Sequence, residues 1–249
     1  MKPGAQPGII PEGSPPAMTG RVELVVVNDN EPGPGLYNDW GWSLYVKAHN
    51  REVLFDADTK YTVIEYNARA LGIDLSRLDF AVLSHWHRDH YGGFPAVAMA
   101  RKGLTIYTPP GPLPRLARLG LEPIPVDKTL HMDGYTIMEP FYVGGLDLYE
   151  LGLIVESPKG PVLVVGCSHP GIDNIVRKAA SIAGDKLFMV IGGFHNPPAD
   201  AIDAVAELVE GPICASHCSG DDAKRYIRSR YPGKSCSVRT GSKITITGA

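Results

Sequence analysis

Three histidines and one carboxylate lie within six residues of this chain, directly after an apolar run that is typical of a buried strand. His85 and His87 are separated by a single residue, so at an extended strand end their side chains should point the same way. The chain must then turn, which should bring Asp89 and His90 back toward the same place from the other side.

Imidazole nitrogens and carboxylate oxygens are ligand types that zinc, iron and manganese accept. Two facing pairs of such ligands can hold two ions roughly 3.5–4 Å apart, a spacing that serves to activate a bridging water. The alternative is a polar surface turn. Four ligand-type side chains in six positions, in a chain with only eight histidines, favour a metal site.

Three further histidines also follow apolar runs, at the expected ends of other strands. Open α/β sheets bind their ligands just past the carboxyl ends of strands, so all three should face one cleft. We predict His169 and His217 as metal ligands. His195 is not needed to fill the ion shells, and we assign it to substrate phosphate binding or proton transfer. His49 and His131 lie in expected loops and should be solvated surface residues.

Composition excludes several classes of protein. A formal net charge of -3 with both signs mixed gives no support for nucleic-acid binding. No apolar run approaches the roughly 20 residues of a membrane span, so no membrane partner is expected. Residues 1–7 hold no long apolar stretch, so we expect no secretory signal and a cytoplasmic protein.

The four cysteines allow two disulfides in principle, and Cys214 and Cys218 have a CxxxC spacing that zinc can use, although a partner pair is missing. In a reducing cytoplasm most of these thiols should be free.

The chain divides into a Pro/Gly-rich tail, residues 1–20, and a single domain, residues 21–249. Periodicity predicts strands first and then strand–helix alternation, with loops, a short helix and strands between residues 109 and 140. A histidine-bearing strand end in each half suggests an α/β fold of two stacked sheets with helices outside, an αββα sandwich of two similar halves. Strands are expected at 22–27, 43–48, 52–55, 80–84, 104–107, 187–191, 213–215, 235–238 and 243–246, a hairpin at 147–155 and 161–165, and helices at 62–71, 94–101, 172–182, 199–209 and 221–230.

The six-residue segment resembles the HxHxDH signature of the metallo-β-lactamase superfamily. More narrowly, the chain resembles the 7,8-dihydropterin-6-methyl-4-(β-D-ribofuranosyl)aminobenzene-5′-phosphate synthase subfamily. The narrower resemblance depends on short motifs along the chain: Asn-Asp-Asn at 28–30, Leu-Phe-Asp at 54–56, Leu-Gly-Ile-Asp at 71–74, Gly-Cys-Ser-His-Pro-Gly-Ile at 166–172, Gly-Gly-Phe-His at 192–195 and Ser-His-Cys-Ser-Gly at 216–220.

The resemblance implies a metallo-β-lactamase-like αββα sandwich of two mixed sheets with a metal pair in the sheet-edge cleft. It places His85 and His87 on one ion, and Asp89 and His90 on the other. When the donors are counted so that each ion has three, His169 is assigned to the first ion and His217 to the second. One or two divalent ions per chain are expected, with zinc first and Mn, Fe or Mg as alternatives.

Two departures from the superfamily pattern matter. Most of its hydrolases have a further histidine before the second-half hairpin, and this chain has none between His131 and His169. His169 can replace it, and Glu150 can supply an oxygen. Cys167 stands where a bridging aspartate is usual, so a thiolate, Glu150 or water alone could bridge the ions. Asp56 resembles the family's structural aspartate, which orients a ligand histidine.

The resemblance implies a metal-dependent enzyme that condenses a dihydropterin methyl diphosphate with a ribofuranosylaminobenzene phosphate and releases diphosphate. We assign His195 and Asp89 as catalytic residues. Divalent ions suit this reaction because they neutralise a departing diphosphate. The substrate would be a phosphorylated small molecule, and a pterin is one candidate. Four aromatic residues near the cleft could stack on a flat ring or belong to the core: Trp86, Tyr91, Phe94 and Phe194.

Three alternatives remain open. The same ions would activate water, so the first alternative is a phosphoesterase-type hydrolase of a small phosphorylated metabolite. The second is a flavodiiron-like redox protein, although the chain has no room for a flavin domain. The third is metal binding without catalysis, which an open cleft disfavours. The oligomeric state is left open.

Overall fold

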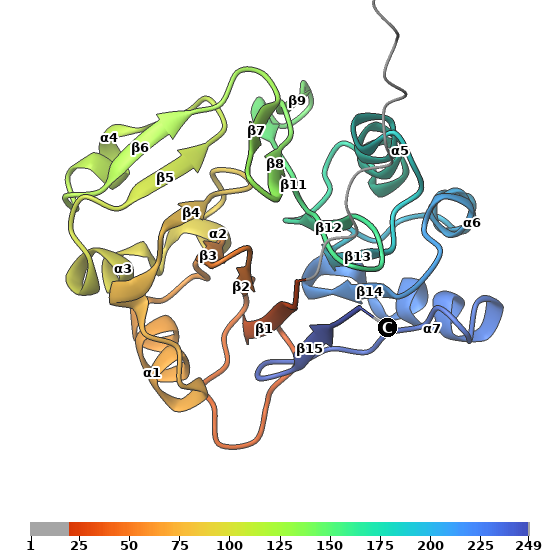
Figure 1. Ribbon diagram of the computed structural model, residues 1–249, viewed down its shortest axis with the longest axis horizontal. Coiled ribbons are helices and arrows are strands. Elements are labelled where there is room, and N and C mark those ends of the chain that lie inside the picture. The colour runs from red at the N-terminus through yellow and green to blue at the C-terminus, as the bar shows by residue number, and fades with distance from the viewer. Residues whose placement is uncertain (1–19, 249) are drawn as a thin grey trace, which may run out of the picture.

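The computed structural model describes residues 20–248, so the predicted tail lies outside the described residues except for Gly20. Two large mixed sheets face each other, with helices on both outer faces (Figure 1). The first sheet has the order β15-β1-β2-β3-β4-β5-β6. Its strands are β1 (Val22–Asn28), β2 (Ser43–Ala48), β3 (Arg51–Phe55), β4 (Phe80–Val82), β5 (Thr105–Thr108), β6 (Glu122–Pro125) and β15 (Lys243–Ile246).

The second sheet has the order β14-β13-β12-β11-β8-β7, and a separate two-stranded sheet pairs β9 with β10. These strands are β7 (Leu130–Met132), β8 (Tyr135–Ile137), β9 (Phe141–Val143), β10 (Leu148–Glu150), β11 (Leu153–Val155), β12 (Val162–Val165), β13 (Met189–Gly193) and β14 (Ile213–Ser216). The predicted αββα sandwich is therefore confirmed.

Helices cover the outer face of each sheet (Figure 1). The first half carries α1 (Tyr61–Leu71), α2 (Arg88–Tyr91), α3 (Phe94–Ala100), α4 (Pro114–Ala117) and the 3₁₀ turn η1 (Leu75–Arg77). The second half carries α5 (Ile172–Ala183), α6 (Ala199–Leu208), α7 (Asp221–Arg230) and the 3₁₀ turn η2 (His217–Ser219). The five long helices that the sequence predicts all form, with ends within one residue of the expected positions.

Alternation along the strands explains the layers. In β1, Leu24 and Val26 belong to the core between the sheets, whereas Val25 and Val27 pack under the outer helices of the first half. In β12 every residue is buried, because the strand has the inter-sheet core on one face and α5 and α6 on the other. A strand buried on both faces requires a continuous apolar run, as the sequence shows here.

Parallel pairing sets the position of the cleft. In the first sheet β3, β4 and β5 are parallel neighbours, and in the second sheet β12, β13 and β14 are parallel neighbours. The carboxyl ends of parallel neighbours lie at one edge, so the polar residues that follow each strand gather there.

Two predicted strand assignments are wrong. Residues 148–150 do not extend the second-half hairpin but pair with β9 across the turn at residues 144–147, leaving only β11 to pair with β12. The predicted strand at 235–238 is reduced to one bridge, between Ser235 and Ile213. The segment after that bridge runs in irregular backbone toward β15.

The expectation that most thiols are free is also corrected. Cys214 and Cys236 form a disulfide, and only Cys167 and Cys218 are free. The bridge at Ser235 brings the two half-cystines together, because the backbone N–H of Cys236 donates to the carbonyl of Ile213, the neighbour of Cys214. Within residues 20–248, no helix is both long and apolar enough to cross a membrane.

The core between the sheets should dominate the stability of the domain. Leu153 on β11 is fully buried there, whereas Leu146 is 51% exposed. We expect Leu153→Ala to lower the free energy of unfolding by about 2–5 kcal/mol, through lost burial and the cavity left behind. The matched Leu146→Ala change should stay within about 0.5 kcal/mol. Chemical denaturation of both variants measures the difference, and equal losses would contradict this account of the core.

Candidate metal centre

Two groups of ligand-type side chains meet at the cleft between the sheets. His85, His87 and His169 form the first group, and their ligand atoms lie within 4.8 Å of one another. The Nε2 atom of His85 is 3.1 Å from Nδ1 of His87. The ring of His169 lies 4.7 Å from the ring of His85 and 4.9 Å from that of His87, measured between centroids.

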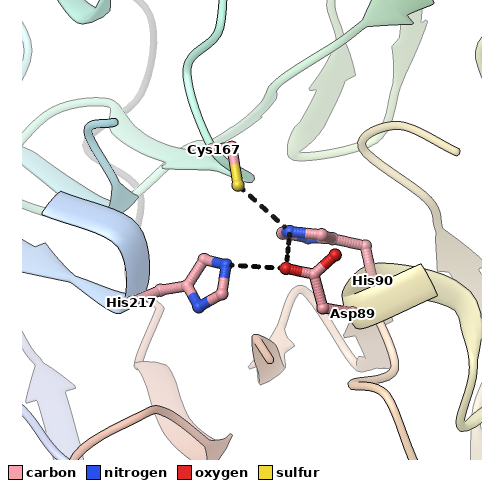
Figure 2. A group of neighbouring side chains, drawn as sticks. All are labelled: Asp89, His90, Cys167 and His217. Carbon is pink, nitrogen blue, oxygen red and sulfur yellow. Dashed lines mark hydrogen bonds and ion pairs between the residues drawn. The ribbon is translucent and has the colours of Figure 1, made fainter. Parts of the chain in front are cut away.

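Asp89, His90, Cys167 and His217 form the second group, again with ligand atoms within 4.8 Å of one another. Figure 2 shows their donor atoms pointing toward one another from three segments: α2, which carries both Asp89 and His90, the loop after β12, and η2. Oδ2 of Asp89 lies 3.3 Å from Nε2 of His217 and 3.7 Å from Nε2 of His90, and His90 Nε2 lies 3.2 Å from the sulfur of Cys167.

In three of these histidines, His90, His169 and His217, a side-chain oxygen holds the Nδ1 nitrogen. Nδ1 of His90 contacts Oδ2 of Asp56 at 2.7 Å, and Nδ1 of His169 contacts Oε2 of Glu150 at 2.8 Å. Nδ1 of His217 contacts the side-chain oxygen of Asn30 at 3.0 Å. With Nδ1 fixed in this way, Nε2 of each ring faces the cleft, which is the usual arrangement for metal-binding histidines.

Asp56 lies where the sequence comparison with the superfamily placed it, beside a ligand-type histidine. Its other contacts are the backbone N–H and the hydroxyl of Ser84, both at 2.7 Å, so one carboxylate holds His90 and the end of the β4 segment together. Ser84 in turn contacts Nδ1 of His85 at 2.9 Å.

Glu150 does not act as the metal ligand that its sequence position suggested. Its carboxylate is fully buried and accepts the backbone N–H groups of Cys167, Ser168 and His169 at 2.7–2.8 Å, in addition to the ring of His169. Both of its oxygens are therefore engaged, and it belongs to neither ligand group. It acts on the loop that carries Cys167 and His169 rather than on the cleft directly.

Electrostatics agree with these roles. Burial lowers the pKa of His85 well below its ordinary value, so its ring is neutral. Burial alone would also lower the pKa of His90, but the Asp56 carboxylate outweighs burial and raises it to about 9. Burial would raise the pKa of Asp89, yet the ring of His217, whose Nε2 lies 3.3 Å from Oδ2, and the charge of His90 hold that pKa well below the usual range. Asp89 is thus a carboxylate.

One buried atom tests whether the donors fit an ion. Nε2 of His217 is buried and has no hydrogen-bond partner among the described residues, although it points at Asp89. A buried polar atom without a hydrogen bond is costly unless something else satisfies it. A divalent ion between His217, His90 and Asp89 would do so, and imidazole, carboxylate and thiolate donors suit zinc or iron. The donor set therefore fits a metal.

His195 is a member of neither group, although it lies next to both, beside His169 and Cys167. Its ring is exposed, packs 4.5 Å from the ring of His169, and shares with it a cavity of about 470 Å³ between the first turns of α5 and α6. A larger cavity of about 680 Å³, between α7 and residues 235–242, contains no residue of either group.

Some residues that contact the two ligand groups were not predicted from the sequence. Asp29 accepts the backbone N–H of His217 at 2.6 Å, and Asn30 holds its ring, although both lie almost 190 residues earlier in the chain. Trp40 donates its indole N–H to Asp89 at 3.1 Å from an exposed loop. Cys218 lies beside Cys167 and His195, and not with Cys214, the partner that the CxxxC spacing offered, because Cys214 is in a disulfide with Cys236.

Comparison with solved structures agrees with the fold. The chain matches a metal-dependent hydrolase of the β-lactamase superfamily with a TM-score of 0.76 at 23% identity, covering 91% of this chain and 99% of that one. A metallo-β-lactamase fold protein from Bacillus subtilis matches with a TM-score of 0.66 at 12% identity, over 90% and 99% of the two chains. The chain has the metallo-β-lactamase fold.

One curated relative carries a more specific name. The 7,8-dihydropterin-6-methyl-4-(β-D-ribofuranosyl)-aminobenzene-5′-phosphate synthase of Methanocaldococcus jannaschii is 28% identical, over 73% of this chain and 80% of the relative. The resemblance to this synthase that the motifs indicated is therefore confirmed as a similarity. No family model matches the chain.

The raised pKa of His90 has a measurable consequence. Near pH 7 the metal-free ring is protonated, and an ion can bind Nε2 only after that proton leaves. Metal affinity should therefore rise as the pH increases from 7 to about 9, because a pKa of about 9 means less competition from the proton at higher pH. Calorimetry in buffers of different ionisation enthalpy counts the released protons. Asp56→Asn removes the carboxylate that keeps the proton on His90, so this variant should release about one proton fewer at pH 7. Equal proton release by both proteins would refute the assignment.

The two ligand groups predict distinct effects for individual histidines. His169→Ala and His217→Ala should each lower affinity for Mn²⁺ by more than the roughly 10–100-fold typical of residues that only orient a ligand. His195→Ala should leave Mn²⁺ binding nearly unchanged, because its ring lies outside both groups. His131→Ala, an exposed site on β7, is the matched control. Loss of Mn²⁺ from the His195 variant, with normal binding in the His169 variant, would mean that their roles are exchanged.

Proposed function

We propose that the protein is a metal-dependent enzyme that joins a dihydropterin methyl diphosphate to the amine of a ribofuranosylaminobenzene phosphate and releases diphosphate. The observation that carries the proposal is the meeting of two open ligand groups beside a cavity, in a chain similar to a synthase of that product. The first group offers three protein ligands, and the second has one carboxylate and a single cysteine, so neither is a Cys₄ or Cys₂His₂ cage of the kind that structural zinc sites use.

The proposed reaction depends more on neutralising the charge of the leaving diphosphate than on covalent catalysis by the protein. A C–O bond to the diphosphate breaks, a C–N bond to the amine forms, and the amine loses one proton. Bound divalent ions would stabilise the charge on the leaving diphosphate. His85, His87 and His169 would hold one ion, and Asp89, His90 and His217 the other, with Cys167 on the second.

The cavity gives the substrate a place. It opens between α5 and α6, next to His169, and its lining includes Arg177 as a cation and Asp173 as an anion. In this proposal Arg177 would contact a substrate phosphate, and Asp173 would accept hydrogen bonds from the amino edge of a pterin ring. His195, exposed at the same mouth, is placed to accept the proton that the amine loses.

The same arrangement can deliver water instead of an amine, so hydrolysis of a phosphorylated small molecule is the second candidate. The exposed position of His195 favours it, because a ring open to solvent can deprotonate water as readily as an amine. The flavodiiron-like alternative is not carried further. Asp89 is the one carboxylate in the two ligand groups, whereas carboxylate-rich sites are expected there.

A single assay separates the two candidates. The metal-loaded protein is given the dihydropterin methyl diphosphate with and without the aminobenzene phosphate, and diphosphate release is followed together with product mass. A synthase should release diphosphate only when the amine is present, and form the coupled product. A hydrolase should release it in both cases.

His87→Ala should abolish release together with binding of the ion at the first group while leaving a folded domain, because His87 lies at the partly exposed edge of that group. His131→Ala should behave like the unchanged protein. The proposed reaction is rejected when the metal-loaded protein gives no coupled product, and metal dependence is rejected when the His87 variant keeps full activity.

A further inference from the structure

A third group of ligand-type side chains lies beside the two described above. The sulfur atoms of Cys167 and Cys218 and a ring nitrogen of His195 lie within 4.8 Å of one another. Cys167 follows β12, and Cys218 lies in η2, directly after β14. The strand between them in the sheet is β13, so the two thiols approach each other across an intervening strand.

Gly193, at the end of β13, makes this approach possible. A Cβ atom on Gly193 would lie 2.7 Å from the sulfur of Cys218 and 2.6 Å from the carbonyl oxygen of Gly166. Any side chain there would push Cys218 away from Cys167. The lack of a side chain therefore keeps the two sulfurs together.

Each member of the group is also held by its backbone. Glu150 fixes the N–H of Cys167, and the carbonyl of Cys218 accepts the N–H of Asn196 at 3.2 Å. His195 has a φ of 52°, in the left-handed region that non-glycine residues rarely adopt. Strained backbone of this kind persists where the surrounding structure enforces it and is concentrated at functional sites.

We propose that Cys167, His195 and Cys218 form a third metal position for one thiophilic ion, such as Zn²⁺ or Cd²⁺. Two sulfurs and one imidazole make this the softest donor set in the cleft, because thiolates select soft ions whereas imidazole and carboxylate groups also accept Mn²⁺ and Fe²⁺. Each thiol would lose its proton to solvent as the ion binds. Three protein ligands leave an open coordination position toward the cavity.

Cys167 belongs to the second group as well as to the third, so its sulfur would bridge two ions. An ion in the third position would also occupy the ring of His195. The proton-transfer role proposed for His195 therefore applies to protein that holds only the first two ions, and this one consequence rests on the proposed function.

The test compares two alanine variants of neighbouring buried residues. Cys218→Ala removes one ligand atom of the third group. Ser216→Ala, two residues earlier, removes one buried hydroxyl that has no hydrogen-bond partner among the described residues and belongs to none of the three groups. Full-length protein is stripped of metal and titrated with Cd²⁺, with bound metal measured after gel filtration and the thiolate-to-cadmium absorption followed in the ultraviolet.

We expect three Cd²⁺ per chain in the unchanged protein and in Ser216→Ala, but two in Cys218→Ala, with a matching loss of thiolate absorption. His195→Ala should also bind two, and because His195 is exposed this variant tests the proposal even if Cys218→Ala does not fold. Binding of only two Cd²⁺ by the unchanged protein, or of three by His195→Ala or a folded Cys218→Ala, overturns the proposal. Mn²⁺ binding by the first two groups is measured separately, so a failure of the third position is distinguishable from a failure of the proposed function.

Discussion

The cleft depends on buried carboxylates that hold the ligand-type residues from behind. Asp56 and Glu150 have no exposed surface, and each accepts hydrogen bonds from both backbone and imidazole groups. A buried carboxylate is stable only when such partners surround it, so the carboxylate and its partners fix one another. The direction of each imidazole follows from this constraint, and so does the common point at which the nitrogens meet.

The two sheets contribute to this constraint unequally. The first half supplies a compact segment in which four donor residues follow β4 between His85 and His90, two before α2 and two within it. The second half supplies isolated donors, Cys167, His169 and His217, from the ends of different strands. The parallel order of β12, β13 and β14 brings these ends to one edge. A long inter-sheet core, in which Phe55 and Val164 are fully buried, keeps the two edges facing each other.

Much of this could be predicted from the sequence, for reasons that differ between residues. The four donors from His85 to His90 could be predicted from their local spacing. A strand end followed by a turn brings residues that are two to five positions apart in the sequence to the same side. His169 and His217 could be predicted because each follows an apolar run, and strand ends share an edge. The helices could be predicted because their apolar residues recur with helical periodicity over ten or more positions.

Other features depend on contacts that local patterns do not contain. The role of Glu150 depends on three successive N–H groups pointing inward, which requires the left-handed backbone of Ser168. The pairing of residues 148–150 with β9 rather than β12 depends on competition between strands of similar apolar content. The contact of Cys218 with Cys167 depends on Gly193, in a third strand, and the Cys214–Cys236 disulfide on a single bridge in irregular backbone.

The division of the donors between the two halves links metal supply to the lifetime of the protein. Ions held by His87 and His169, or by Asp89 and His217, would cross-link segments that lie about 80 and 130 positions apart in the sequence. An ion that binds only the folded chain adds stability by mass action, about 2.7 kcal/mol when its free concentration is one hundred times its dissociation constant. Cells short of metal would thus hold a less stable form, which proteases attack more readily. The abundance of the protein, and not only its activity, would then follow the availability of the ion.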